Sequence, residues 1–174
     1  MNMRRVVIPM DGSDFSCGVL PFVQSFLDPA QTEVVLLTIV TRDPNGVSGR
    51  SEPLRAPNAF ASQSNMGSDD RQLARRFIYA SQEWDSAVAD AKAALSPMVK
   101  QLRNAGFEAK SEVKFGHDVA DTIASFVSTG AADMVAMSTH SRSGLSRMVR
   151  GSVAEEVMRQ VKVPVIMMHP AVKA

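Results

Sequence analysis

Short apolar runs alternate with stretches of helical periodicity along this chain. Three of the runs, at 5–10, 33–40 and 132–138, are continuous and rich in aliphatic residues, which is typical of strands buried on both faces of a sheet. A fourth run of this kind lies at 163–169. The segment 107–116 alternates between apolar and polar residues instead, and it predicts a less buried strand at an edge of the sheet.

Between the strands, apolar residues recur at the spacing of amphipathic helices. The predicted helices span 14–27, 71–105, 118–129 and 153–161. The apolar face of the longest helix consists of Trp84, Val88, Ala91, Leu95, Met98 and Leu102. The residues expected to face inward from the last helix are Val153, Val157, Met158 and Val161.

Prolines and glycines modify these helices. Pro21 is expected to kink the first helix or to move its start later along the chain, because proline disrupts a helix interior. For the same reason Pro97 is expected to bend or split the helix 71–105. Gly106 and Gly130 follow the predicted ends of two helices, where glycine is the usual cap.

This order of elements defines the expected fold. Strands that alternate with helices predict an α/β protein with a doubly wound, five-stranded parallel sheet and helices on both faces, similar to a Rossmann fold. A chain of 174 residues suits a single domain, 1–174. Residues 42–70 show no periodicity and predict a long flexible insertion, which is either functional or mobile. In such sheets, ligands bind beyond the carboxyl ends of the strands where the strand order reverses.

Composition and charge narrow the choice of partners. The net charge is +1 and aromatic residues make up 6% of the chain, so neither nucleic acid nor an anionic membrane is an expected partner. No apolar run reaches the length of a membrane-spanning helix, and the first residues lack a secretory signal pattern. Cys17 is the only cysteine, which fits a reducing compartment. We therefore expect a cytoplasmic protein. The three histidines show no metal-ligand spacing, so no metal site is expected.

Two polar stretches follow predicted strand ends. The first, MDGSD at 10–14, contains Asp11, which could accept hydrogen bonds from ribose hydroxyls or could form part of a turn or helix cap. The second, STHSRSGLSRMVRGSVAEE, runs from Ser138 to Glu156. Neither stretch contains the GxxxxGK[ST] or GxGxxG phosphate-binding motif.

The second stretch offers two interpretations. Gly151 and Ser152 precede a helix whose free N–H groups could bind phosphate, but Ser152 and Glu155 also form a capping box that satisfies the helix by itself. Arg142 and the two arginines after it could pair with phosphates or form a solvated loop face. These alternatives stay open on the pattern alone.

The segments VVIPMDGSDFS near the start and HSRSGLSRMVRGSVAEEVMRQVKVPVIMM near the end resemble the universal stress protein family, whose fold is of the adenine nucleotide alpha hydrolase type. The likeness covers nearly the whole chain apart from the insertion. The nucleotide-binding type of this family carries G-x2-G-x9-G-[S/T]. The four motif positions here are Ser138, Ser141, Gly151 and Ser152. The spacing is intact, but serine replaces the first two glycines.

These serines act in two opposite ways. A Cβ atom hinders the close approach of a phosphate, whereas the hydroxyl can donate a hydrogen bond to it. The resemblance implies an adenine nucleotide, ATP or AMP, with Mg²⁺ beside ATP, bound by a stress-response sensor or switch that shows at most weak ATP hydrolysis. The alternative is a protein-interaction module of the same fold that binds no nucleotide.

The resemblance also implies a role for individual residues. Asp11 would hold the ribose, the main chain near Ile39 would meet the adenine, and Pro9 and Met10 would line the pocket with Met137. The residues expected to surround the phosphates are Ser138, Ser141, Arg142, Gly151, Ser152 and Val153. The full set of implied nucleotide-binding residues is Pro9, Met10, Asp11, Ile39, Met137, Ser138, Ser141, Arg142, Gly151, Ser152 and Val153. Family members commonly pair through the last strand, so a homodimer through 163–169 is expected.

Overall fold

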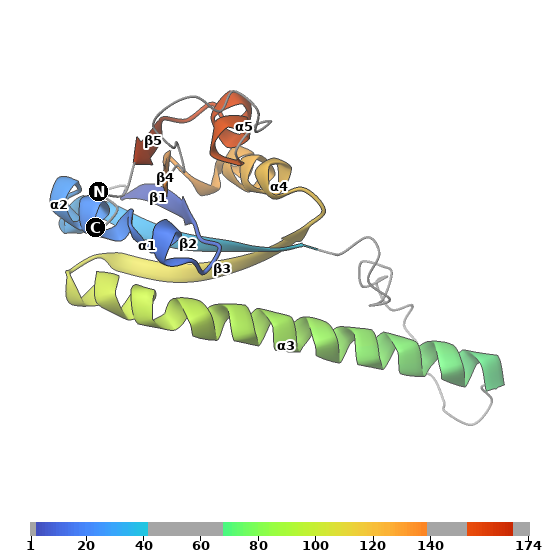
Figure 1. Cartoon of the computed structure of the whole chain (residues 1–174). Helices are drawn as coiled ribbons and strands as arrows, with labels where there is room; N and C mark the ends of the chain where they lie inside the picture. The colour runs from blue at the N-terminus through green and yellow to red at the C-terminus, as the bar shows by residue number, and fades with distance from the viewer. Residues whose placement is uncertain (1–2, 42–67, 139–152, 169–174) are drawn as a thin grey trace. The chain divides into compact units, whose positions relative to one another are not determined.

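The computed structural model describes residues 3–41, 68–138 and 153–168 (Figure 1). In the long helix, side chains are described from residue 84 onward. The chain divides into two compact units, one formed by 1–42 with 91–174 and the other by 43–90. The first unit contains the whole sheet. The described part of the second unit is the first portion of a helix that begins at Ser68.

Five parallel strands form one sheet in the order β3-β2-β1-β4-β5. Their bounds are β1 Arg4–Pro9, β2 Thr32–Thr41, β3 Glu108–Gly116, β4 Met134–Ser138 and β5 Val165–Met168. The doubly wound parallel sheet and the edge position of β3 are therefore as predicted. The order reverses at β1, because β2 lies on one side of it and β4 on the other.

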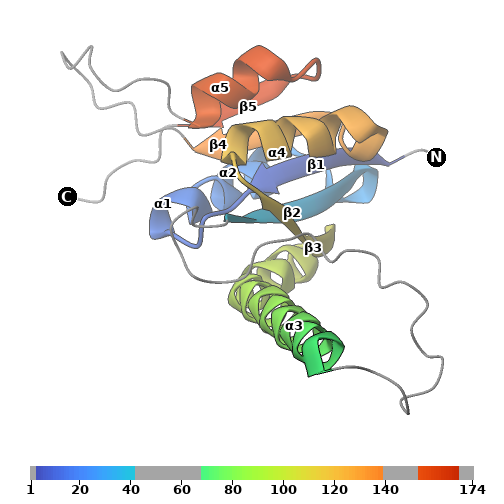
Figure 2. The same ribbon diagram turned by 90° about the vertical axis from the view of Figure 1, so that its right-hand side faces the viewer.

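Helices cover both faces of the sheet (Figures 1 and 2). On one side, termed the α1–α3 face, lie α1 (Asp14–Cys17), α2 (Leu20–Phe26) and the portion of α3 (Ser68–Asn104) that belongs to the first unit. On the other, termed the α4–α5 face, lie α4 (Val119–Phe126) and α5 (Val153–Gln160). The described ranges also contain two short elements, the 3₁₀ turn Pro29–Gln31 and the π turn Val127–Ala131.

The side-chain alternation of β1 shows why the apolar runs are continuous. Val6 and Ile8 are buried in the cluster of the α1–α3 face, whereas Val7 is buried in the cluster of the α4–α5 face. Successive residues of a strand point to opposite faces, so a strand covered on both sides needs apolar residues at every position.

Proline has different effects in the two helices where it occurs. The predicted helix 14–27 is two helices separated at Gly18 and Val19, and Pro21 lies in the first turn of the second, so its start is displaced as expected. Pro97 does not split α3, which continues to Asn104. Pro97 is exposed, so the carbonyl that loses its N–H partner lies on the solvated side of the helix.

The end of α3 follows the predicted glycine cap. Gly106 has a φ of +91°. Its N–H donates to the Arg103 carbonyl at 3.0 Å, and the Phe107 N–H donates to the Leu102 carbonyl at 3.1 Å. Leu102 and Phe107 are both buried, which completes a Schellman motif with its hydrophobic contact.

The inward face of α5 differs from the prediction. Ala154 and Val157 are buried, but Val153 is 42% exposed and Met158 is 49% exposed. The small Ala154 permits the helix to lie close to the sheet, and the stripe Ala154, Val157 and Val161 is narrow enough to leave its flanking residues in solvent. On α3, Leu95, Met98 and Leu102 pack on the core as predicted, together with Val99.

A charged ladder joins the first three strands near their amino ends. The buried carboxylate of Glu33 on β2 binds the Arg5 guanidinium on β1 at 2.7 Å and the Lys110 ammonium on β3 at 2.5 Å. Burial raises the pKa of Glu33, but the hydrogen bonds and charges of Lys110 and Arg5 outweigh it and hold the pKa below its usual value. The main-chain N–H of Arg5 also donates to Asp133 at 2.7 Å.

Replacing the central carboxylate tests this ladder. We expect Glu33→Gln to lower the free energy of unfolding at pH 7 by about 1–2 kcal/mol, because two cations lose a charged acceptor. The folded pKa is below the unfolded one, so the carboxylate stabilises the protein above about pH 4.3 and this contribution is lost as the pH falls through the folded pKa. Urea unfolding at pH 7 and at low pH measures both effects.

The matched control is Glu108→Gln, since Glu108 is exposed at the start of the neighbouring strand. We expect it to change stability by less than about 0.5 kcal/mol. Equal losses in the two variants, or a difference that does not shrink on acidification, would contradict the assignment.

Candidate functional site

Six of the described residues that the sequence placed in a binding site lie at the carboxyl ends of β1, β2 and β4, namely Pro9, Met10, Asp11, Ile39, Met137 and Ser138. Ile39 and Met137 both pack against the cluster of the α4–α5 face. The side chain of Met10 is buried in the opposite cluster, so its main chain, rather than its side chain, is nearest the shared edge. Pro9 is half-buried beside Leu37.

Hydrogen bonds fix the main chain at this edge. The Met10 N–H donates to the Leu37 carbonyl at 2.8 Å, and the Thr38 hydroxyl donates to the Met10 carbonyl at 3.2 Å. Thr38 is not among the predicted site residues, although a single hydroxyl inside the apolar run 33–40 is a visible signal. These two bonds hold the chain in place at the residue before Asp11.

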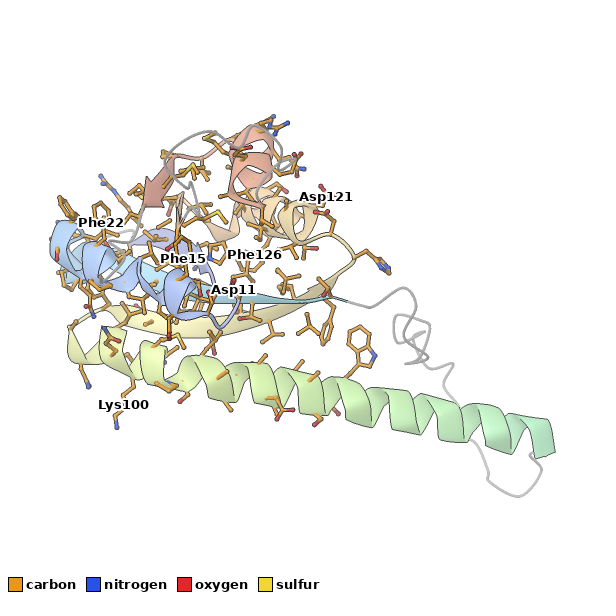
Figure 3. The ribbon with its side chains drawn as sticks, in the orientation of Figure 1. Asp11, Phe15, Phe22, Lys100, Asp121 and Phe126 are labelled. Carbon is orange, nitrogen blue, oxygen red and sulfur yellow. The ribbon has the colours of Figure 1, made fainter. Side chains whose placement is uncertain are left out.

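Asp11 begins the loop between β1 and α1, where Figure 3 labels it. Its Oδ1 accepts hydrogen bonds from the Ser13 N–H at 2.9 Å and from the Ser13 hydroxyl at 2.6 Å. Ser13 in turn caps α1 by accepting from the Ser16 N–H at 3.1 Å. Asp11 therefore forms an Asx turn, and the helix cap is Ser13. Gly12, between them, has a φ of +80°.

These bonds set the charge of Asp11. Partial burial raises the pKa of its carboxyl group, but hydrogen bonds from Ser13 and Ser16 outweigh that effect and leave the pKa below the usual aspartate value. The carboxylate is therefore ionised at neutral pH. An exposed, ionised and oriented carboxylate is an acceptor for ligand hydroxyl groups.

Ser138 ends β4 at the same edge of the sheet. Its Oγ is buried and has no hydrogen-bond partner within the part of the chain that the structure describes. An unpaired buried hydroxyl costs about 1–3 kcal/mol, so such a group needs an explanation.

Val153, the first residue of α5, borders a hollow of about 550 Å³ between the amino ends of α4 and α5. The residues that line it are His117, Asp118, Val119, Ala120, Val153, Glu156 and Arg159. Of these residues, only Val153 is among the predicted site residues. The available signal was that 117–118 joins a strand end to a helix start, as MDGSD does.

Four predicted residues, Ser141, Arg142, Gly151 and Ser152, lie outside the described residues, and the phosphate part of the site therefore stays a prediction. Within the described ranges, no three histidine, cysteine, aspartate or glutamate side chains gather as metal ligands. None of the helices in those ranges is long and apolar enough to cross a membrane.

Comparison with known proteins identifies the class. The Universal stress protein family matches residues 2–169, so this chain belongs to that family. No curated protein sequence matches it.

Solved structures confirm the fold. A hypothetical protein designated MJ0577 is 18% identical with a TM-score of 0.65, over 97% of both chains. A universal stress protein in complex with cAMP is 17% identical with a TM-score of 0.59, over 98% of this chain and 100% of its own. A family member from Arabidopsis thaliana with AMP bound is 13% identical with a TM-score of 0.56, over 97% of this chain and 93% of its own.

The loop that presents Asp11 depends on the backbone of Gly12. A Cβ atom at this position would meet nothing within 4 Å, so a substitution there changes only the cost of the positive φ. We expect Gly12→Ala to destabilise the protein by about 1 kcal/mol and Gly12→Asn by less, because asparagine tolerates the left-handed region better. Urea unfolding followed by circular dichroism measures both, and equal losses in the two variants would count against this explanation.

Proposed function

We propose that this protein binds an adenine nucleotide at the carboxyl edge of β1, β2 and β4 and acts as a stress-response sensor or switch. The observation that carries the proposal is the oriented, ionised carboxylate of Asp11 at the strand-order reversal. A carboxylate in this position is suited to a ribose. The ligands of two similar structures, cAMP and AMP, support the same ligand class.

The site has parts for the rest of the nucleotide. The main chain near Ile39 would meet the adenine, and Pro9 and Met10 would line the pocket with Met137. Ser141, Arg142, Gly151 and Ser152 would hold the phosphates, and Mg²⁺ would accompany ATP. A cytoplasmic location fits this role.

A second candidate function is a protein-interaction module that binds no nucleotide. The observation that favours it is the serine at Ser138 and Ser141, where the family motif has glycine. A Cβ atom at these positions reduces the space for phosphate groups. The two functions make opposite predictions for ligand binding.

Thermal unfolding with AMP or Mg-ATP tests the proposal. Ligand at 100 times its Kd stabilises the folded state by about 2.7 kcal/mol, which corresponds to a rise of roughly 5–10 °C in Tm. We expect Asp11→Ala to weaken binding by about 10- to 100-fold, because a hydrogen bond to a charged group is lost. Isothermal titration calorimetry gives the Kd values.

Asp28→Ala is the matched control. Asp28 also accepts from the N–H two residues later, Ala30, at 2.9 Å, but it lies between α2 and β2 at the opposite edge of the sheet. It should lose a similar amount of stability and keep full affinity. The absence of any rise in Tm at millimolar nucleotide would favour the interaction module.

We also propose a homodimer through the last strand, 163–169. β5 pairs with β4 along one edge, and its other edge has no strand beside it among the described residues. All four residues of β5 are only partly buried. An unpaired edge of this kind can be satisfied by a second copy related by a two-fold axis.

Analytical ultracentrifugation at micromolar concentrations is expected to give twice the 18.8 kDa chain mass. Hydrogen exchange should show β5 amides gaining protection as concentration rises. A monomer at all concentrations, or protection confined to other strands, would contradict this dimer.

A further inference from the structure

The buried hydroxyl of Ser138 has no role in the fold that the described residues account for. It ends β4, where the side chain is partly covered and Oγ is fully covered, yet no donor or acceptor meets it in the described part of the chain. We propose that Ser138 Oγ is a ligand-reading group that hydrogen-bonds the ribose of the nucleotide and makes the site prefer ribonucleotides over 2′-deoxyribonucleotides. This inference rests on the proposed nucleotide site.

The strand register places Ser138 next to the Asp11 loop. Val6 aligns with Met134 and Val7 with Val135 in the pairing of β1 and β4. Carried forward along both chains, the same register sets Ser138 level with Met10, one residue before Asp11. The Ser138 hydroxyl and the Asp11 carboxylate therefore lie beyond the carboxyl ends of two adjacent strands, β4 and β1, where the strand order reverses.

Strand alternation gives the side on which the hydroxyl lies. Ala136 is buried in the cluster of the α1–α3 face and Met137 in the cluster of the α4–α5 face. Ser138 follows Met137, so it lies on the α1–α3 side, the side of the loop that leads into α1. The side chains of Ile39 and Met137 lie on the opposite side, so they do not compete with Ser138 for a group on the α1–α3 side.

The chemistry of the pair selects the ligand group. An ionised carboxylate only accepts hydrogen bonds, whereas a serine hydroxyl both donates and accepts. A neutral vicinal diol matches this pair, since the 3′-hydroxyl can donate to Asp11 while the 2′-hydroxyl accepts from Ser138. A phosphate oxygen at the same place would be repelled by the ionised Asp11. The ribose diol is therefore the favoured partner.

The unpaired Ser138 hydroxyl also predicts that stability without nucleotide and nucleotide affinity respond in opposite directions to its removal. Burying it without a partner is unfavourable, so its removal should not harm the unliganded fold. Ser138→Ala is expected to raise the Tm of the nucleotide-free protein or leave it unchanged, while weakening nucleotide binding. A serine with a purely structural role would behave in the reverse way.

Calorimetric titration with AMP and with 2′-deoxy-AMP tests the inference. We expect the wild-type protein to prefer AMP by about tenfold, the equivalent of one hydrogen bond. Ser138→Ala should weaken AMP binding by about 5- to 10-fold and 2′-deoxy-AMP binding by less than twofold, so that the preference collapses. Ser138→Gly is the second variant, and it should lose the preference in the same way.

The control is Ser25→Ala, because the Ser25 hydroxyl is exposed on α2 and donates to the Pro21 carbonyl at 2.8 Å. It should leave both affinities unchanged. If the wild type binds both nucleotides and Ser138→Ala weakens them equally or not at all, the ribose assignment is wrong while the proposed function stands. If the wild type binds neither nucleotide, the proposed function fails and this inference fails with it.

Discussion

The architecture depends on the need of a parallel sheet to bury both of its faces. β1 shows this most directly, since Val6 and Ile8 serve one apolar cluster and Val7 the other. Because every strand runs in the same direction, all five carboxyl ends meet at one edge, and the helices must return across the faces. The polar loops that follow the strands are therefore gathered at that edge, which makes it the place for a ligand.

The amino and carboxyl ends of the strands differ in how their polar side chains are paired. Near the amino edge, charges are neutralised internally, with Glu33 held between Arg5 and Lys110. At the carboxyl ends of the strands, two polar side chains keep unused hydrogen-bonding capacity. Asp11 is oriented by Ser13 but remains exposed, and the Ser138 hydroxyl is buried without a partner in the described part of the chain.

Ser138 and Ser141 stand where the family motif has glycine. Serine at positions where close approach favours glycine removes space and adds a hydroxyl group. The buried position of Ser138 Oγ means that this added group is costly unless a ligand satisfies it. In the proposed complex the ribose would satisfy this hydroxyl, so nucleotide binding would offset the cost that Ser138 imposes on the free protein.

Sequence periodicity by itself determined the strands, the parallel doubly wound sheet and the edge position of 107–116, because a period of two or a continuous apolar run reports how many faces a strand buries. It also located Asp11 and Ser138 at strand ends. It could not determine that Pro97 would leave α3 unbroken, which depended on the proline facing solvent. Nor could it show that Val153 and Met158 would be exposed, that Thr38 would bind Met10, or that Ser138 Oγ would lack a partner. Those outcomes depend on distances between strands and helices remote in sequence, and only the tertiary structure decides them.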